Sequence, residues 1–476
     1  MRSHSARIAV TLVAILSAAC AADPAGAGSA RGGADPATAV AMPEQWHAPA
    51  TRGESRPDLA QWWQGFRDPL LSELVTRALA ANPDLDAARA RLRAARAALR
   101  GSRGAFLPSV GASAQASRRD TSGSSQPAVD SYQAGFDASW EIDVFGGLRS
   151  AARASRADLA RAAANLDDVR RSLAAELALG YIDARSAQER LAVAQRNLGY
   201  QDESVQITGW RSQAGLVSTL DLEQAKLLRA QTAATIPQLQ ASFQGAANRI
   251  ALLLGEPAGS VTARLEAGGA IPAAPVSIEA GIPADLLRRR PDVIAAERSL
   301  AAEVARIGVA RADLFPALRL SGVLSSTAAS VGDLGASADR SLVAGITAPL
   351  FQGGRLRARL AQQRASADAA LAVYRGTVLG ALEEAESALV TVDAARRREE
   401  QLALAEDAAL AALQLADAQY RAGLIDFQSL LDAQRSLLGT QDGRVVARAA
   451  RSTGAIQLYK ALGGGWVPSA ETEVTQ

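Results

Sequence analysis

The sequence predicts a membrane protein of the α+β class, in which four strands per chain are joined to very long helices. Three observations lead to this class. Sequence landmarks recur 208 residues apart, so one unit is used twice along the chain. Two segments in each unit alternate apolar and polar side chains, the pattern of a strand with two unlike faces. Two stretches of more than one hundred residues hold no proline, which permits long uninterrupted helices.

The composition excludes several classes of function. The 476 residues carry a formal net charge of only +2, from 51 basic and 49 acidic side chains, so nucleic acid is not an expected partner. His4 lies in the extreme N-terminal segment and His47 in a proline-rich stretch, so neither is placed to build a catalytic triad. Two histidines and one cysteine, Cys20, are too few for a His/Cys metal cluster. We therefore expect no enzyme, no cofactor and no metal centre. An enzyme built on carboxylates alone is the weakest alternative.

The N-terminus has the pattern of a secretory signal peptide. Positive charges precede a short apolar run at residues 8–16, and small residues follow directly before Cys20. The run is shorter than the ~20 apolar residues of a retained membrane helix. We predict a signal peptide over 1–19, lipidation of Cys20 and a flexible tether over 20–58. Ala21 follows the cysteine, which resembles the pattern of lipoproteins sorted to the outer membrane. The alternative is an ordinary signal peptide with an incidental cysteine.

An internal repeat organises most of the chain. Its landmarks are Pro83-Asp84 and Pro291-Asp292, Pro108 and Pro316, and Ala214-Gly215-Leu216 and Ala422-Gly423-Leu424. Each unit is far longer than a solenoid repeat, which indicates a duplicated domain. The predicted segments are repeat one over 59–255, an irregular connection over 256–283, repeat two over 284–463 and a C-terminal tail over 464–476.

The strands carry the clearest pattern. From Tyr132 to Val144 every even-numbered residue is apolar, and every odd-numbered residue is polar or glycine. Strands of this length with one apolar and one polar face fit a transmembrane barrel. The acidic residues of the polar face, Asp137, Glu141 and Asp143, are candidates for lining a channel lumen. The alternative is a soluble β-sandwich with one solvent-exposed face. The predicted strands lie at about 108–118, 131–144, 316–326 and 340–351.

Each second strand leads into a helix of unusual length. No proline interrupts the segment from Gly147 to about Gly209, which at a rise of ~1.5 Å per residue would extend ~95 Å. A similar segment in repeat two ends at Arg421. Short breaks at Gly215 and Gly423 then predict that each long helix folds back on its successor as an antiparallel hairpin.

Four membrane strands cannot close a barrel, so the chain must associate with copies of itself. A bilayer does not tolerate the open edge of a sheet, because its backbone groups would lack hydrogen-bond partners. Two chains would give eight strands around an interior filled by side chains, and three would give twelve around an open lumen. The acidic inward face favours the twelve-stranded arrangement, whose lumen is filled with water.

Several longer motifs resemble one protein family. They are Trp62-Trp63 through Asp68-Pro69-Leu70, Asn82-Pro83-Asp84-Leu85, Ile282-Pro283-Ala284-Asp285-Leu286-Leu287, Arg288-Arg289-Arg290-Pro291-Asp292, Ala214-Gly215-Leu216, Tyr420-Arg421-Ala422-Gly423-Leu424 and Tyr459-Lys460-Ala461-Leu462-Gly463-Gly464-Gly465-Trp466. Over nearly the whole mature chain, the sequence is similar to the TolC/OprM-type outer-membrane efflux channels. These are the outer-membrane lipoproteins of tripartite resistance-nodulation-division efflux systems.

The resemblance implies a passive exit duct for small molecules such as drugs or metal ions. It implies a homotrimer with a twelve-stranded outer-membrane β-barrel, a long α-helical barrel reaching into the periplasm and a mixed equatorial collar that includes residues 256–283. The expected partners are a periplasmic adaptor protein, an inner-membrane pump and outer-membrane lipid. Two alternatives remain: the channel of a type I protein-secretion system, which would look alike, and a lipid-tethered coiled-coil scaffold without a barrel.

The resemblance also points to a periplasmic gate at the helix turns. Asp221 and Asp432 match positions that carry acidic rings near the periplasmic aperture of TolC-like channels. Trp210 and Tyr420, just before the two breaks, are candidates for packing that holds the tip shut. The alternatives are two solvated helix carboxylates and ordinary packing between helices.

Three residues depart from the gate pattern of the family. Ser429 stands where the second repeat of some relatives has another aspartate. Gln224 is the repeat-one counterpart of Asp432. Ile425 replaces a gate arginine seen in some members, so any gating ion pair must differ in this chain.

Overall fold

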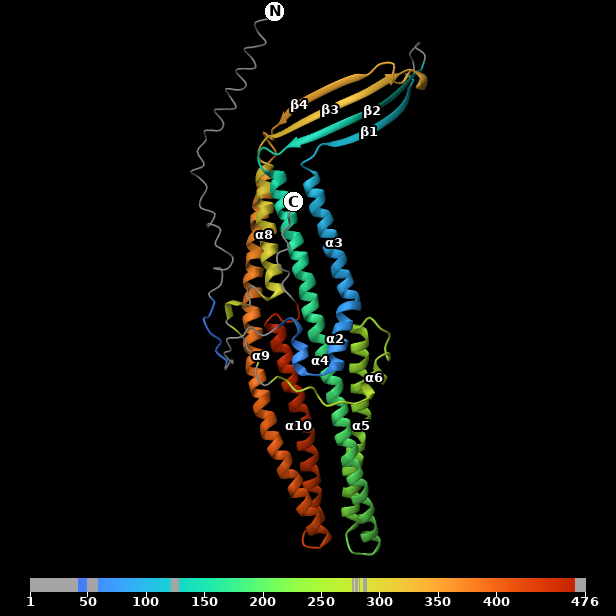
Figure 1. Cartoon of the computed structure of the whole chain (residues 1–476), viewed down its shortest axis with the longest axis vertical. Coiled ribbons are helices and arrows are strands. Elements are labelled where there is room, and N and C mark those ends of the chain that lie inside the picture. The colour runs from blue at the N-terminus through green and yellow to red at the C-terminus, as the bar shows by residue number, and fades with distance from the viewer. Residues whose placement is uncertain are drawn as a thin grey trace, which may run out of the picture. The chain divides into compact units, whose positions relative to one another are not determined.

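A computed structural model of the chain (Figure 1) describes residues 42–48, 59–120, 128–275, 278, 281, 283–285 and 289–466. All of these belong to the unit that runs from Met42 to Gln476. The predicted signal peptide, the lipidation site at Cys20 and most of the tether lie outside the described residues. So does most of the predicted C-terminal tail.

The two repeats contain matching helices at the predicted spacing of 208 residues. Paired helices have equal lengths of 22, 67 and 35 residues, so the internal repeat is confirmed. The pairs are α3 (Pro83–Gly104) with α8 (Pro291–Ala312), α4 (Gly147–Gln213) with α9 (Arg355–Arg421), and α5 (Thr219–Leu253) with α10 (Phe427–Ala461).

Short elements complete the described chain. They are η2 (Leu59–Phe66), α2 (Pro69–Ala81), α6 (Thr262–Glu266), η3 (Pro283–Asp285) and η4 (Val331–Asp333). The start of α2 shows how the sequence sets these boundaries. Asp68 accepts a hydrogen bond from the amide of Leu71, and Pro69 occupies the first turn, where its missing N–H costs nothing.

Four strands form one antiparallel sheet in the order β1-β2-β3-β4. They are β1 (Ser109–Arg119), β2 (Val129–Ile142), β3 (Ala317–Ala328) and β4 (Asp339–Thr347). The central pair, β2 with β3, joins repeat one to repeat two. Figure 1 shows the sheet at one end of the long helices, with α3, α4, α8 and α9 leading into or away from it.

Two strands end earlier than the sequence predicted, and each has a physical reason. β2 ends at Ile142 rather than at residue 144, because the Asp143 carboxylate accepts hydrogen bonds from the amides of Leu148 and Arg149 and so begins α4. β4 ends at Thr347 rather than at residue 351. Pro349 follows, and proline has no N–H to donate to the strand ladder.

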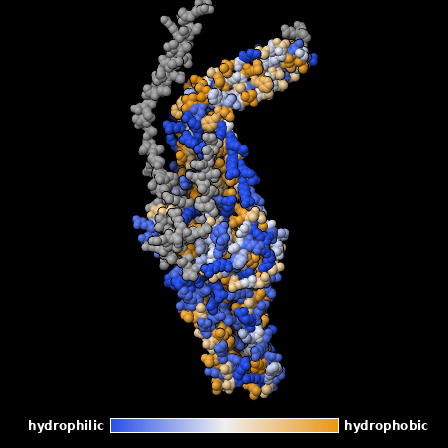
Figure 2. All heavy atoms as spheres, in the orientation of Figure 1, coloured by the Kyte–Doolittle hydropathy of each residue, from blue (hydrophilic) through white to orange (hydrophobic). Residues whose placement is uncertain are grey.

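The strand register places most of the apolar residues of the four strands on one face, although Val323 and Val343 lie on the other. Residues directly opposite each other in an antiparallel pair share a face. Ala138 lies opposite Val110 and Gly322, and Gly322 lies opposite Leu342. The other face of the sheet carries the odd-numbered residues of β2, so the predicted alternation holds across the sheet. Figure 2 shows hydrophobic residues along the strands.

The long helices pack through small side chains. Gly308 of α8 lies against Ser150 of α4 so closely that an added Cβ would come within 2.6 Å of the Ser150 hydroxyl oxygen. Alanines fill much of the buried face of α4, including Ala174, Ala178 and Ala184. Small residues let helix backbones approach closely, which explains why so few aromatic residues suffice. Within the described residues, no helix has the length and apolarity needed to cross a membrane.

The two repeats make the same side-chain-to-backbone hydrogen bond at equivalent positions, alongside the middle of the long helices α4 and α9. The side-chain amide of Asn82 donates to the carbonyl of Leu253 at 2.9 Å. Arg290, 208 positions later, donates to the carbonyl of Ala461 at 3.2 Å. Each of these hydrogen bonds fixes the start of α3 or α8 to the end of α5 or α10. Trp62 adds a stacked contact with Tyr459, at 5.3 Å between ring centroids.

Candidate functional site: the polar strand face and the hairpin tips

The polar face of the sheet holds two of the three predicted lumen carboxylates. Asp137 is exposed and lies over Gly111 of β1, whose missing side chain leaves room for the carboxylate. Glu141 accepts hydrogen bonds from Arg319 of β3, with a shortest N–O distance of 3.1 Å. The polar face is therefore charged at this position but locally balanced. Whether it lines a lumen stays a prediction.

Asp143, the third of these carboxylates, lies just beyond the strand. It accepts hydrogen bonds from the backbone amides of Leu148 and Arg149. It also forms an ion pair with the Arg149 guanidinium at 3.0 Å. Partial burial by itself raises the pKa of Asp143, but these hydrogen bonds and the positive charge outweigh it and lower the pKa below the usual value. Asp143 thus caps α4 and holds the sheet to the helix. Its predicted place in a lumen remains untested.

The two hairpin tips have the same backbone design. Gly215 and Gly423 end α4 and α9 with φ of 71° and 74°, the left-handed conformation that glycine adopts without strain. The next amides, of Leu216 and Leu424, donate back to carbonyls of the last helical turn at 2.8 and 2.9 Å. The side chains of Leu216 and Leu424 are 73% and 75% exposed.

The two predicted gate carboxylates have local partners at the tips. Asp221 forms a capping box with Ser218, in which each side chain accepts a hydrogen bond from the other residue's amide. Asp432 is exposed, accepts a hydrogen bond from Gln428 at 3.0 Å and lies 3.5 Å from the guanidinium of Arg435. Neither interaction prevents a carboxylate from facing a channel axis, so the acidic rings stay a prediction.

The two predicted gate aromatics lie in different surroundings. Tyr420 is only 7% exposed, belongs to an apolar cluster at the tip and packs against Phe427 at 5.4 Å between ring centroids. The Arg211 guanidinium lies over the Tyr420 ring at 4.8 Å from its centroid. Trp210 is 61% exposed. Within one chain, Tyr420 therefore packs inside the tip, whereas Trp210 is exposed. That either residue holds the tip shut stays a prediction.

Two of the residues that depart from the family's gate pattern, Ser429 and Ile425, make local contacts at the second tip. Ser429 donates its amide and hydroxyl to Asp426, which caps α10. Ile425 packs against the apolar cluster that holds Tyr420. These residues therefore stabilise the start of the second tip, where an arginine or another aspartate would add charge.

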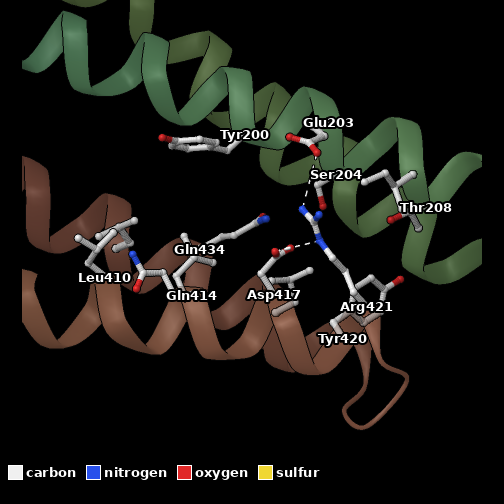
Figure 3. A pocket seen from close by; sticks show the side chains of 14 residues that line it. Tyr200, Glu203, Ser204, Thr208, Leu410, Gln414, Asp417, Tyr420, Arg421 and Gln434 are labelled. Carbon is white, nitrogen blue, oxygen red and sulfur yellow. Dashed lines mark ion pairs between the residues drawn. The ribbon is translucent and has the colours of Figure 1, made fainter.

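A pocket above the tips was not predicted from the sequence. It lies between α4 of one hairpin and α9 and α10 of the other, and has a volume of about 310 Å³ (Figure 3). Arg421 pairs across it with Glu203 of α4 at 3.7 Å and, on its own helix, with Asp417 at 2.9 Å. Glu203 and Arg421 are more than two hundred positions apart, so no local spacing could have joined them. Arg421 itself stands in the motif that precedes the second glycine break.

The described residues contain no group of three or more His, Cys, Asp or Glu side chains arranged to hold a metal ion. Some charges along the helices form ion pairs between elements. Arg190 pairs with Asp442 at 2.7 Å, and Arg448 pairs with Glu189 at 2.7 Å. Both pairs tie α4 to α10, because their members face each other across the two repeats.

This chain combines a sheet that has one apolar face with long antiparallel helical hairpins, and this architecture places it in the class of membrane-channel subunits. The comparison with family models gives the particular family. The model described as "Outer membrane efflux protein" matches residues 74–256 and 282–464, once for each repeat. The chain belongs to this outer membrane efflux protein family.

Similar proteins support this assignment over most of the chain. The pyoverdine export outer membrane protein OpmQ of Pseudomonas aeruginosa is 33% identical over 437 residues, which cover 90% of this chain and 92% of OpmQ. The solved outer-membrane channel OprN matches with a TM-score of 0.82 and 39% identity, covering 90% of this chain and 99% of OprN. The open state of the Neisseria gonorrhoeae MtrE outer membrane channel matches with a TM-score of 0.82 and 28% identity, covering 90% and 96%.

Proposed function

We propose that this chain forms a homotrimer that serves as the passive outer-membrane exit duct of a tripartite efflux system. The observation that carries the proposal is the two-faced sheet with open edges. Among the described residues, β1 pairs only with β2 and β4 only with β3, so the outer edge of each has no strand partner. In a bilayer these edges must be paired, and neighbouring copies of the chain can supply the partners.

Three copies fit better than two. Twelve strands leave an open lumen, whereas eight strands are filled by their own side chains. The polar face carries Asp137 and the Glu141–Arg319 pair, and these charged groups need water around them. The four helices of each chain then continue the duct away from the membrane. Helices α4 and α9, at 67 residues, each span ~100 Å at a rise of ~1.5 Å per residue.

The hairpin tips are the proposed contact with a periplasmic adaptor protein. Leu216 and Leu424 are strongly exposed at equivalent positions of the two repeats. Exposed apolar side chains at the end of a helical duct support the contact with another protein. The adaptor would link the duct to an inner-membrane pump that supplies the energy, so the channel itself performs no reaction.

The proposed cargo is small molecules, and the proposed anchor is lipid at Cys20. The name of OpmQ refers to export of pyoverdine, which favours small-molecule efflux over type I protein secretion. The acylated Cys20 would hold the N-terminus in the outer membrane, while the sheet would insert with its apolar face against lipid.

Deletion and reconstitution test this function. A strain lacking the gene should accumulate ethidium, and the wild-type gene should restore its export. The purified protein should cross-link as a trimer and conduct ions in a planar bilayer. The double variant Leu216→Glu with Leu424→Glu should still assemble and conduct but should not restore export. Normal ethidium export in the deletion strain, together with loss of a secreted protein from the medium, would instead favour type I secretion.

A further inference from the structure

The pocket above the hairpin tips has the features of a ligand site. Its volume of about 310 Å³ is at the lower end of the range typical of small-molecule sites. Apolar side chains line one part of it, from α4, α9 and α10. They are Ile207, Leu410, Leu413, Leu430 and Leu437.

Three buried polar atoms at this pocket have no hydrogen-bond partner among the described residues. They are Thr208 Oγ1 of α4, the Tyr420 hydroxyl of α9 and Gln434 Oε1 of α10. The three residues are only 1%, 7% and 9% exposed, and all three line the pocket. A buried polar atom without a partner is costly, so a small rotation that brings these side chains to a hydrogen-bonding group in the pocket is favoured. Figure 3 shows Gln434 extending into the space between the two hairpins.

The charges at the pocket favour a cation. Glu203, Asp417 and Arg421 are the ionisable acids and bases that line it, apart from the tyrosines. Arg421 is 2.9 Å from Asp417 but 3.7 Å from Glu203, so Glu203 is the less fully paired carboxylate. Arg211 lies close by over the Tyr420 ring but does not line the pocket. Tyr200, 58% exposed, also lines the pocket, one turn before Glu203 on the same helix, and adds an aromatic ring (Figure 3).

We propose that this pocket binds a small amphiphilic organic cation, in which a protonated amine is attached to an aromatic or aliphatic body. The amine pairs with Glu203, one turn from Tyr200. The apolar body lies against the leucines, and a polar group of the ligand hydrogen-bonds to Gln434. Because such a ligand contacts both hairpins, its binding stabilises the arrangement of α4 relative to α9 and α10.

A matched pair of probes tests the proposal on the purified full-length protein in detergent. Tryptamine carries the required ammonium group, and tryptophol has the same indole body with a neutral hydroxyl in its place. Binding of each is measured by saturation-transfer NMR titration. We expect tryptamine to bind and tryptophol to bind about fivefold more weakly, the ratio that an ion pair of ~1 kcal/mol gives.

Variants locate the site. Glu203→Gln should weaken tryptamine binding about fivefold and leave tryptophol binding unchanged, because only the charged probe uses the carboxylate. Gln434→Leu should weaken both probes. Glu176→Gln is the control, since Glu176 is an exposed acid on the same helix that pairs with Arg249 away from the pocket. It should change neither affinity.

Amide hydrogen exchange with tryptamine present gives a second readout, with slower exchange expected near Thr208 and Tyr420. The proposal is overturned if tryptamine does not bind at millimolar concentration or if tryptophol binds as tightly. It is also overturned if Glu203→Gln and Glu176→Gln behave alike. None of these measurements depends on conductance or export, so this inference can fail while the proposed function stands.

Discussion

At the scale of single residues, a buried cluster of charges holds the middle of the molecule together. Arg290 is 2% exposed and donates to Asp292 at 3.0 Å and to Glu384 at 2.7 Å. Arg171, 4% exposed, lies 3.4 Å from Asp292 and also donates to the carbonyl of Lys460. The cluster therefore joins α4, α8, α9 and the end of α10. A buried arginine needs such partners, because an unpaired charge is strongly disfavoured away from water.

Removing one carboxylate from this cluster should destabilise the fold. In Asp292→Asn, Arg290 and Arg171 both lose a charged partner. Each keeps one other carboxylate, Glu384 and Asp168 respectively, so we expect a loss of about 2 kcal/mol. The midpoint of urea-induced unfolding, followed by tryptophan fluorescence, measures it. Asp84→Asn is the matched control, because Asp84 holds the equivalent position in repeat one but is exposed. Equal destabilisation by the two variants would contradict the role assigned to the cluster.

The same carboxylate predicts a dependence on pH. Burial raises the pKa of Asp292, but hydrogen bonds from Arg290 and the charges of Arg171 and Arg290 outweigh it, so its pKa in the folded chain lies below the usual value. Its contribution to stability is therefore complete above the unfolded pKa of ~3.9 and is lost as the pH falls through the lower, folded value. The stability difference between wild type and Asp292→Asn should be constant near neutral pH and shrink below about pH 4. A difference that grew on acidification would contradict this sign.

At the scale of elements, the sheet is defined by its two faces. Phe136, Leu342 and Ile346 are exposed on the apolar face of an isolated chain, although a water-soluble sheet would bury such residues. Trp140 belongs to the same face, and its indole N–H donates to the carbonyl of Phe106 at 2.9 Å. This contact ties the strand to the chain that enters β1. The exposed apolar face indicates that lipid rather than water covers it.

Adjacent substitutions in β2 distinguish the two faces. Ala138→Arg places a charge on the apolar face near mid-strand, and we expect it to reduce assembly by about 2–4 kcal/mol. Ser139→Arg places the same charge on the polar face, so this variant should assemble and shift ion selectivity. Heat-modifiable migration in gel electrophoresis measures assembly, and planar-bilayer recordings measure selectivity. Equal assembly of the two variants would show that the assigned faces are wrong.

The helices and strands were largely predictable because their signals are local. Period-two alternation over Tyr132 to Val144 was sufficient to predict β2 and its two faces. The glycine breaks at Gly215 and Gly423 predicted both hairpin turns, because the required left-handed conformation is favourable only for glycine. The strand ends were less predictable. The capping role of Asp143 depends on hydrogen bonds that alternation does not reveal.

At the scale of the whole molecule, the tips determine how the proposed duct would close. If three chains surround one axis, each tip carboxylate appears three times, and like charges ~8 Å apart repel by ~2 kcal/mol at an effective dielectric constant of ~20. Such a ring favours cations and can bind a multivalent one. Asp221 and Asp432 are the residues for which we predict this behaviour.

Conductance of the trimer tests the acidic ring. Asp221→Asn is preferable to alanine, because asparagine can still accept the hydrogen bond of the capping box while losing its charge. Combined with Asp432→Asn, it should weaken block by trivalent cations added from the tip side. Asp86→Asn, an exposed acid of α3 paired with Arg89, serves as the control and should leave block unchanged. Unchanged block in the double variant would place the constriction elsewhere.

The predicted lipid anchor has an independent test. Cys20→Ser should abolish labelling of the protein by a palmitate analogue, because serine has no thiol to receive the lipid. The variant should still assemble, since the strands would anchor the trimer without lipid. Labelling that persisted in this variant would refute lipidation at Cys20.

The sequence by itself determined the duplicated plan, the two-faced strands, the long helices and the hairpin turns. Each depends on a periodic pattern or a glycine within a short stretch, or on landmarks repeated at one spacing. Only the tertiary structure decided which distant residues meet. The structure pairs β2 with β3 across the repeats, builds the charge cluster around Arg290 and forms the pocket between Glu203 and Arg421. These contacts join residues separated by about ninety to more than two hundred positions. Such contacts arise from how whole elements pack, and no local spacing encodes them.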